Sequence, residues 1–241
     1  MQQSSRRWFL LSSAFALLWS STHALGATIR GALPFFSKAS PPERVVAGTW
    51  KYFTSDEATL MEALVDRIIP TDPETPGGKD IGCVVFIDAQ LAGPYGDSAW
   101  LYTNGPFHKG TKEQGPQSAD PPAVQYRKFL AALDHYCRSS GTPFVRLGDD
   151  KKDEILHGVE DSKIKFDGID AKAFFATLVK DTQRGFFADP IYGGNKDMAA
   201  WKMIGFPGAR YDYRDWIDRH NERYPNPPVG IADHPTWSAS R

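Results

Sequence analysis

The chain has 241 residues, enough for one sizeable hydrophobic core or two small ones, and 41% hydrophobic with 24% charged residues is typical of a globular protein. Lys and Arg total 28 and Asp and Glu 29, so a net charge of −1 excludes a basic surface that would hold nucleic acid or an anionic membrane. Aromatic residues make up 13% of the chain, which predicts large buried areas inside the fold or at a protein interface.

Residues 1–24 have the form of an export signal. A paired arginine stands before a short apolar run, and small residues near Ala24 offer a cleavage site. This pattern is typical of a bacterial twin-arginine signal, and an N-terminal helix with a chance arginine pair is the alternative. We therefore expect a periplasmic protein whose remaining domain spans residues 25–241. The residues that carry the signal are Arg6, Arg7, Phe9 and Leu10.

Helical periodicity follows an irregular arm at residues 25–53, for which Phe35, Phe36, Trp50 and Phe53 are the expected anchors. Thr54 and Glu57 have the spacing of a capping box, and apolar residues then repeat at helical spacing until Pro70. Further helices are expected near residues 80–91, 122–139 (with Val124 inward), 149–159 and 170–187. One more follows Asn195 as cap, with Met198, Trp201 and Ile204 inward. No alternating strand series is present, so we predict an all-α fold: a single helical domain with long irregular, aromatic-rich arms and loops.

Residues 92–121 form a long segment without periodicity that is rich in Pro and Gly. A loop of this length is usually either disordered or a binding segment. Its aromatic residues, Tyr95, Trp100, Tyr102 and Phe107, argue against disorder because they need burial.

Motifs of common cofactor and catalytic sites are absent from the sequence. It contains no haem-attachment CxxCH, no GxGxxG, no P-loop, no GxSxG and no HExxH. The histidines lack the spacing of metal ligands, and His135 and His157 are expected to be ordinary residues of helices. We expect no catalytic, cofactor-binding or metal-binding residue in this chain.

Two groups of polar residues leave an acid–base alternative open. Asp66 and Asp72 flank a helix end and are either paired carboxylates or a solvated helix terminus and a turn. Asp212 and Asp215 near His220 are either an acid–base group or surface charge on an aromatic segment. The second group would belong to a free-standing periplasmic enzyme.

Cys83 and Cys137 are the two cysteines. In an oxidising compartment they could bridge each other and close a loop of about 54 residues, which the chain-entropy account values at about 4 kcal/mol. One of them could instead bond to a partner chain, or both could be free buried thiols.

The stretch from Ala188 to Tyr213 is dense in Gly, Pro and aromatic residues, which marks close backbone approach. We predict that it contacts another protein, because apolar and aromatic anchors dominate interface energetics. The alternative is that these residues fill the chain's own core and turns. The predicted interface residues are Pro190, Ile191, Tyr192, Gly193, Gly194, Asn195, Trp201, Phe206, Pro207 and Tyr211.

Two stretches resemble the gluconate 2-dehydrogenase subunit 3 family, the small subunit of membrane-bound sugar and sugar-acid dehydrogenases. They are LMEALVDRIIPTDPETPGGKDIGCVVFIDAQLAGPYG at residues 60–96 and GFFADPIYGGNKDMAAWKMIGFPGARYDYRDWI at residues 185–217. The segments DPIYGGN and WKxxGFPG are the most specific, and a twin-arginine signal is typical of the family.

The resemblance implies a non-catalytic subunit. It would bind a large flavoprotein subunit that carries FAD and lacks its own signal, and it would escort that subunit through the twin-arginine translocase. A multihaem cytochrome c subunit would pass electrons to membrane quinone, so contact with the inner membrane would be peripheral and through partners. FAD and haem c are expected in the partners and no cofactor in this chain. The alternative function is a periplasmic carbohydrate-binding protein whose Trp and Tyr residues stack on sugar faces.

Overall fold

The computed structural model describes residues 43–233 apart from 102–103, 109, 115–117 and 211–212. In this part the only β-structure is two isolated bridges, so the predicted all-α class is confirmed. Short 3-10 turns connect the helices: η1 (Lys112–Gln114), η2 (Phe144–Arg146), η3 (Pro190–Tyr192), η4 (Lys196–Met198), η5 (Arg214–Trp216) and η6 (Ile231–Asp233). The α-helices are α2 (Ser55–Ile68), α3 (Cys83–Leu91), α4 (Pro122–Ser139), α5 (Asp149–Glu160), α6 (Ala171–Phe187) and α7 (Ala199–Ile204).

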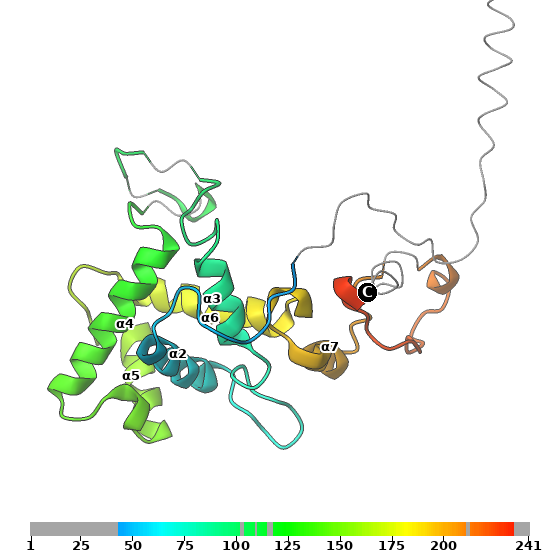
Figure 1. Cartoon of the computed structure of the whole chain (residues 1–241), viewed down its shortest axis with the longest axis horizontal. Coiled ribbons are helices and arrows are strands. Elements are labelled where there is room, and N and C mark those ends of the chain that lie inside the picture. The colour runs from blue at the N-terminus through cyan, green and yellow to red at the C-terminus, as the bar shows by residue number, and fades with distance from the viewer. Residues whose placement is uncertain (1–42, 102–103, 109, 115–117, 211–212, 234–241) are drawn as a thin grey trace, which may run out of the picture.

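The helix α6 is the element around which the others assemble, because it contacts every other described α-helix. Figure 1 shows α2 to α5 grouped along one part of α6, with α7 near its other end and the described residues that follow α7 extending beyond. Buried apolar side chains from α2 to α6 form one core. At its centre the rings of Phe129 and Phe174 stack with centroids 4.4 Å apart.

The helix ends follow the capping signals in the sequence. Thr54 Oγ1 accepts from the Glu57 amide at 3.2 Å, and Glu57 Oε2 accepts from the Thr54 amide at 2.8 Å, so the predicted capping box is confirmed. The Asp170 side chain accepts from the Ala173 amide at 3.0 Å and caps α6, also as predicted.

Expectations from the sequence about α3, α4 and the 92–121 loop were wrong. The helix α3 begins at Cys83 rather than near Asp80, because Gly82 takes a left-handed φ of 88° just before it. Val124 on α4 is exposed rather than inward. In the 92–121 loop Tyr95 is half-buried, but Trp100 is 84% exposed and Phe107 is exposed as well. Tyr102, Phe35 and Phe36 lie outside the described residues.

Residues 43–53, which we call the strap, are held to α3 by a buried carboxylate. Asp88 is 4% exposed, and its two oxygens accept from the amides of Lys51, Tyr52 and Phe53 at 2.8–2.9 Å. The side chain of Phe53 is buried and Trp50 packs against the core, as predicted. A carboxylate with three amide donors and no basic side chain among these bonds is a strong anchor, because charged acceptors form the stronger hydrogen bonds.

Replacing Asp88 should loosen the strap. In Asp88→Ala three amides lose their acceptor, so we expect the free energy of unfolding to fall by about 3 kcal/mol, measured by urea denaturation. Asp88→Asn keeps one oxygen acceptor and should lose less. Asp97→Ala, at an exposed aspartate, is the control and should be neutral. Equal unfolding midpoints for Asp88→Ala and the unmodified chain would contradict this role.

Candidate partner interface

The turn from Asp189 to Gly194 packs against the chain's own helices. A Cβ placed on Gly194 would lie 2.1 Å from the Gly185 carbonyl oxygen on α6, and one on Gly82 would lie 2.6 Å from the Gly193 carbonyl oxygen. Gly193 also has a left-handed φ of 92°. Glycine is needed here because backbone meets backbone at the end of α6 and the start of α3.

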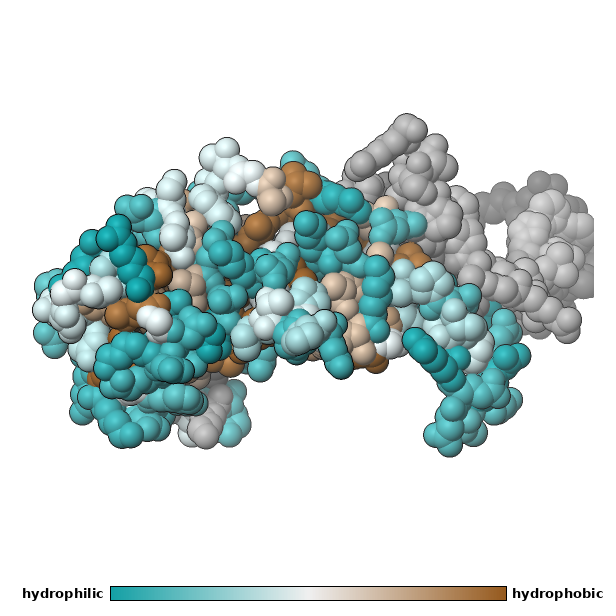
Figure 2. Space-filling model, turned by 90° about the horizontal axis from the view of Figure 1, so that it is seen from below, coloured by the Kyte–Doolittle hydropathy of each residue, from teal (hydrophilic) through white to brown (hydrophobic). Residues whose placement is uncertain are grey.

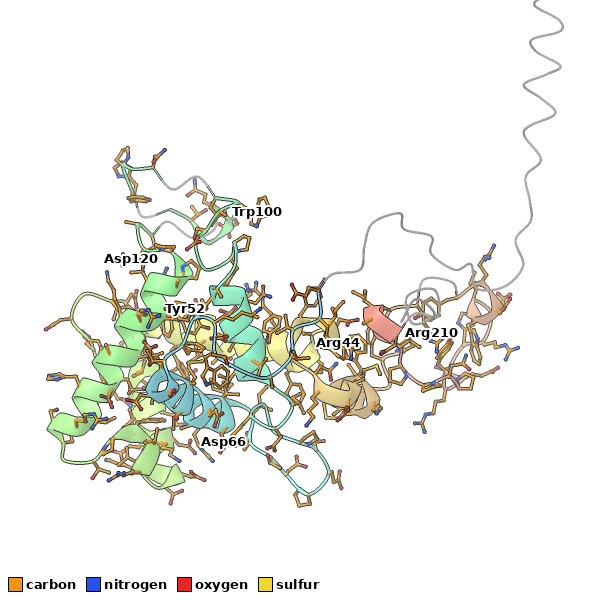
Figure 3. All side chains as sticks on the ribbon, viewed as in Figure 1. Arg44, Tyr52, Asp66, Trp100, Asp120 and Arg210 are labelled. Atoms are coloured by element: carbon orange, nitrogen blue, oxygen red, sulfur yellow. The ribbon has the colours of Figure 1, made fainter. Side chains whose placement is uncertain are left out.

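Residues near both ends of the described chain form hydrogen bonds with this turn. From the strap, the Val45 amide donates to the Ile191 carbonyl at 2.8 Å. The Asp189 carboxylate accepts from the amides of Ile191 at 3.0 Å and Ile231 at 2.7 Å. Arg44 pairs with Asp233 at 3.3 Å, and Figure 3 places Arg44 at this junction. The turn is therefore a structural joint.

A buried asparagine sets the position of α7. Asn195 is fully buried with a left-handed φ of 45°; its Nδ2 donates to the Ala188 carbonyl and its Oδ1 accepts from the Ala200 amide, both at 2.9 Å. The Trp201 Nε1 donates to the Phe187 carbonyl at 2.9 Å. Asn195 was expected as the cap of this helix, but Met198 occupies the N-cap position of α7, because η4 stands between; the Asn195 side chain still accepts from an amide in the first turn of α7.

The predicted interface residues have very different positions. Ile191, Gly194, Asn195 and Trp201 are buried within the chain, so the prediction that they meet a partner is corrected: they fill its own core and turns. Only Tyr192 and Phe206 are exposed, and their contact with a partner stays a prediction. Tyr211 lies outside the described residues, and the half-buried members are Pro190, Gly193 and Pro207.

Beside the buried joint lies an exposed apolar surface, which we call the α7 patch: Phe187, Met203, Ile204 and Phe206, each 42–57% exposed. The rings of Phe206 and buried Trp201 meet edge to face with centroids 5.1 Å apart, and this contact holds Phe206 against α7. Ile204 was expected inward and is instead 57% exposed, because a helix this short buries only its Ala200 and Trp201 face.

A second surface, the aromatic groove, lies between described residues of the loop after α3 (94–101, 104–107 and 118–120), the start of α4 and α6, and has a volume of about 560 Å³. The sequence singled out its aromatic residues but not the α6 side chains that form its other wall. In Figure 3 Trp100 projects from the loop above α3. Its lining includes Trp100, Leu101, Phe107, Thr177, Lys180 and Arg184.

Beneath the groove is a buried cluster of polar side chains. The Asp181 carboxylate, 4% exposed, accepts from the hydroxyls of Tyr95 at 2.8 Å and Tyr126 at 3.0 Å, and pairs with Arg184 at 2.9 Å. Burial first, and then the Asp181 charge, raise the pKa values of both phenols well above the ordinary value. Both hydroxyls therefore stay protonated and donate, so the cluster ties the loop and α4 to α6.

The described members of the two acid–base alternatives make the contacts of a turn and of surface residues. Asp72 accepts from the amides of Glu74 and Thr75 at 2.8 and 2.7 Å and from the Thr75 hydroxyl, which lowers its pKa and marks a turn. Asp215 and His220 are both exposed, and among the described residues no hydrogen bond joins them. Asp212 lies outside those residues, and His135 and His157 are on the surface, as ordinary helix residues can be.

Both cysteines are free thiols in the structure, so the internal bridge considered from the sequence is not formed. Cys83 opens α3, which packs on α6 and α2, whereas Cys137 is near the end of α4, which packs on α6 and η2. Burial raises the pKa of Cys83 to about 12, and burial with the nearby Asp134 raises that of Cys137 to about 11. Each thiol is therefore protonated and shielded.

The described part contains no helix that is both long and apolar enough to cross a bilayer. Nor do three or more His, Cys, Asp or Glu side chains of that part gather into a group that could hold a metal ion. Figure 2 shows a mainly hydrophilic face from below with smaller hydrophobic areas.

The fold defines a small all-α protein built around α6, with a glycine-dependent joint at the end of that helix. The family model described as gluconate 2-dehydrogenase subunit 3 matches residues 55–208, nearly two-thirds of the sequence, and the chain belongs to this family. The match includes the α7 patch and the groove. Searches of curated proteins and of solved structures found no significant match. The family name implies a subunit of a multisubunit dehydrogenase.

The joint should tolerate no side chain at Gly194. Gly194→Ala would push a Cβ into the Gly185 carbonyl and force backbone to move, so we expect a loss of about 3 kcal/mol in the free energy of unfolding. Gly48→Ala, where a Cβ meets nothing within 4 Å, is the matched control and should be neutral or slightly stabilising. The two variants are compared by chemical denaturation. Similar unfolding midpoints would show that the backbone at the joint can shift to accommodate a Cβ at position 194, and would contradict the prediction.

The thiols should be unreactive in the folded chain. At pH 8, below both raised pKa values, a maleimide reagent should label neither cysteine, and denaturation should release two labelled thiols per chain. Intact-mass measurement before and after unfolding provides the count. Finding no free thiol after unfolding would mean that the cysteines are bridged.

Proposed function

We propose that this chain is the non-catalytic small subunit of a periplasmic, membrane-associated, flavin-dependent sugar or sugar-acid dehydrogenase. It binds the FAD-containing large subunit, and its Arg6–Arg7 signal takes both chains through the twin-arginine translocase in the folded state. A multihaem cytochrome c subunit completes the complex and provides its contact with the inner membrane. FAD and haem c belong to the partners.

Family membership supports the subunit role, and the exposed α7 patch is the observation that carries the proposal of a protein partner. Three of its large exposed apolar side chains, Met203, Ile204 and Phe206, lie on one short segment, and the fourth, Phe187, ends α6; exposed apolar groups of this size are typical of an interaction site. Asn195 and Trp201 fix this segment to the end of α6, so the patch is presented in one position and little conformational freedom is lost on binding.

A carbohydrate-binding protein is the second candidate, favoured by one observation. Trp100 lines the aromatic groove together with the polar side chains of Asn104 and Asp120. An indole beside hydrogen-bonding groups can stack on a sugar face. This candidate requires binding by the isolated chain, seen as a sugar-dependent change of Trp fluorescence.

The α7 patch should be needed for recovery of the flavoprotein. When the tagged chain is isolated from its native periplasm and membrane, we expect one larger chain, flavin absorbance and haem c bands. Ile204→Asp with Phe206→Ser should reduce the recovered flavin at least about tenfold, because two interface anchors are lost. Val145→Asp, at an exposed apolar residue of η2, is the control and should leave recovery unchanged. Isolation of the unmodified chain as a colourless, stable monomer would contradict the proposal.

The export role predicts a shared dependence on the signal. With Arg6→Lys and Arg7→Lys together, both this chain and the large subunit should remain in the cytoplasm, as fractionation and immunoblotting would show. A reporter exported in the unfolded state is the control and should be unaffected. Normal export of the large subunit in this variant would exclude escort.

A further inference from the structure

The α6 wall of the aromatic groove and Phe187, the one member of the α7 patch that belongs to α6, lie on one face of that helix. Thr177, Lys180, Arg184 and Phe187 follow at spacings of three, four and three residues, which places them on the same side of the helix. The first three line the groove, and Phe187 belongs to the patch. From Thr177 to Phe187 is about 15 Å along the helix, so the two surfaces are separated by about one turn, between Arg184 and Phe187.

The α7 patch is too small to bind a protein by itself. A stable interface buries about 800 Å² on each partner and involves about 20–30 residues, whereas the patch has four apolar side chains. A partner centred on the patch must therefore cover neighbouring surface. In the direction of α6 that surface leads to further exposed apolar side chains, Trp100 at 84% and Leu101 at 51%.

The α6 wall of the aromatic groove is cationic on its exposed side. Lys180 is exposed and has no ion-pair partner among the described residues, and the Arg184 side chain is half-exposed even though it pairs with Asp181. A surface that covers this stripe is complementary if it presents carboxylates between apolar groups.

We propose that the aromatic groove is the second half of the binding surface, occupied by the same large subunit that covers the α7 patch. The segment that enters it is apolar, with at least one carboxylate facing Lys180. This inference rests on the proposed function and assigns the groove as a protein contact. Trp100 is then an anchor side chain, of the residue type that most often dominates binding energy at interfaces.

The exposure of Trp100 favours protein over sugar as the occupant. An indole that forms a fixed sugar platform has one face packed against its own protein, which holds the ring in the stacking orientation. At 84% exposure the Trp100 ring has little such support. Its neighbours at the groove, Leu101 and Phe107, are also exposed and apolar, which suits an apolar partner surface.

The test is site-specific photo-cross-linking in the native host, with the cross-linking amino acid placed in the full chain at position 100, 206 or 145 in turn. We expect positions 100 and 206 to capture the same large chain and position 145, on η2, to capture none. Capture at 206 but not at 100 would overturn the groove inference and leave the proposed function standing. Capture of no flavoprotein at either position would overturn both.

Two variants add a quantitative readout on the isolated complex. Trp100→Ala should weaken subunit binding at least about tenfold. Lys180→Glu should weaken it by about fivefold, with a smaller effect at high salt because the lost attraction is screened. Neither side chain is buried, and circular dichroism should confirm unchanged folding. Unchanged subunit affinity in both variants, or a Trp100-dependent fluorescence response of the isolated chain to neutral sugars or sugar acids without cross-linking at 100, would overturn the inference.

Discussion

The position of the 190–194 turn and of α7 relative to α6 depends on a contact between backbones. Gly194 approaches the Gly185 carbonyl, and the Gly193 carbonyl approaches Gly82, more closely than any side chain would allow. This contact brings the end of α6, the start of α3 and the turn at 190–194 together, and Asn195 and Trp201 then set α7 upon it. The density of glycine in this stretch is thus explained by the chain's own packing. The surface proposed for a partner is the exposed α7 patch beside it.

Helices could be predicted from the sequence because their signals are local. The Thr54 capping box, the Asp170 cap and the apolar spacing each depend on residues within a few positions of one another. The all-α class followed from the same periodicity. The start of α3 was misplaced because the left-handed Gly82 is held by a contact with Gly193, more than a hundred residues further along the chain.

The candidate site was only partly predictable, for a related reason. The sequence showed that the 188–213 stretch is special but could not separate side chains that face inward from those that face out. Trp201 and Ile204 are three residues apart on the same helix, yet one is buried and the other is 57% exposed. The groove was harder still, because one wall is the loop and the other is α6, and no local pattern links Trp100 to Lys180.

The strap has a consequence for the order in which this protein can form. The Val45 amide donates to the Ile191 carbonyl, and Arg44 pairs with Asp233. These early residues therefore contact positions 146 and 189 residues later in the chain. During synthesis residues 44 and 45 cannot make these contacts until residues 191 and 233 have emerged, whereas the other end of the strap, residues 51–53, needs only Asp88. Closing the longer loops is the slower step. For the proposed escort, the first described residues of the strap would therefore become fixed late in synthesis, whereas the end held by Asp88 could become fixed earlier.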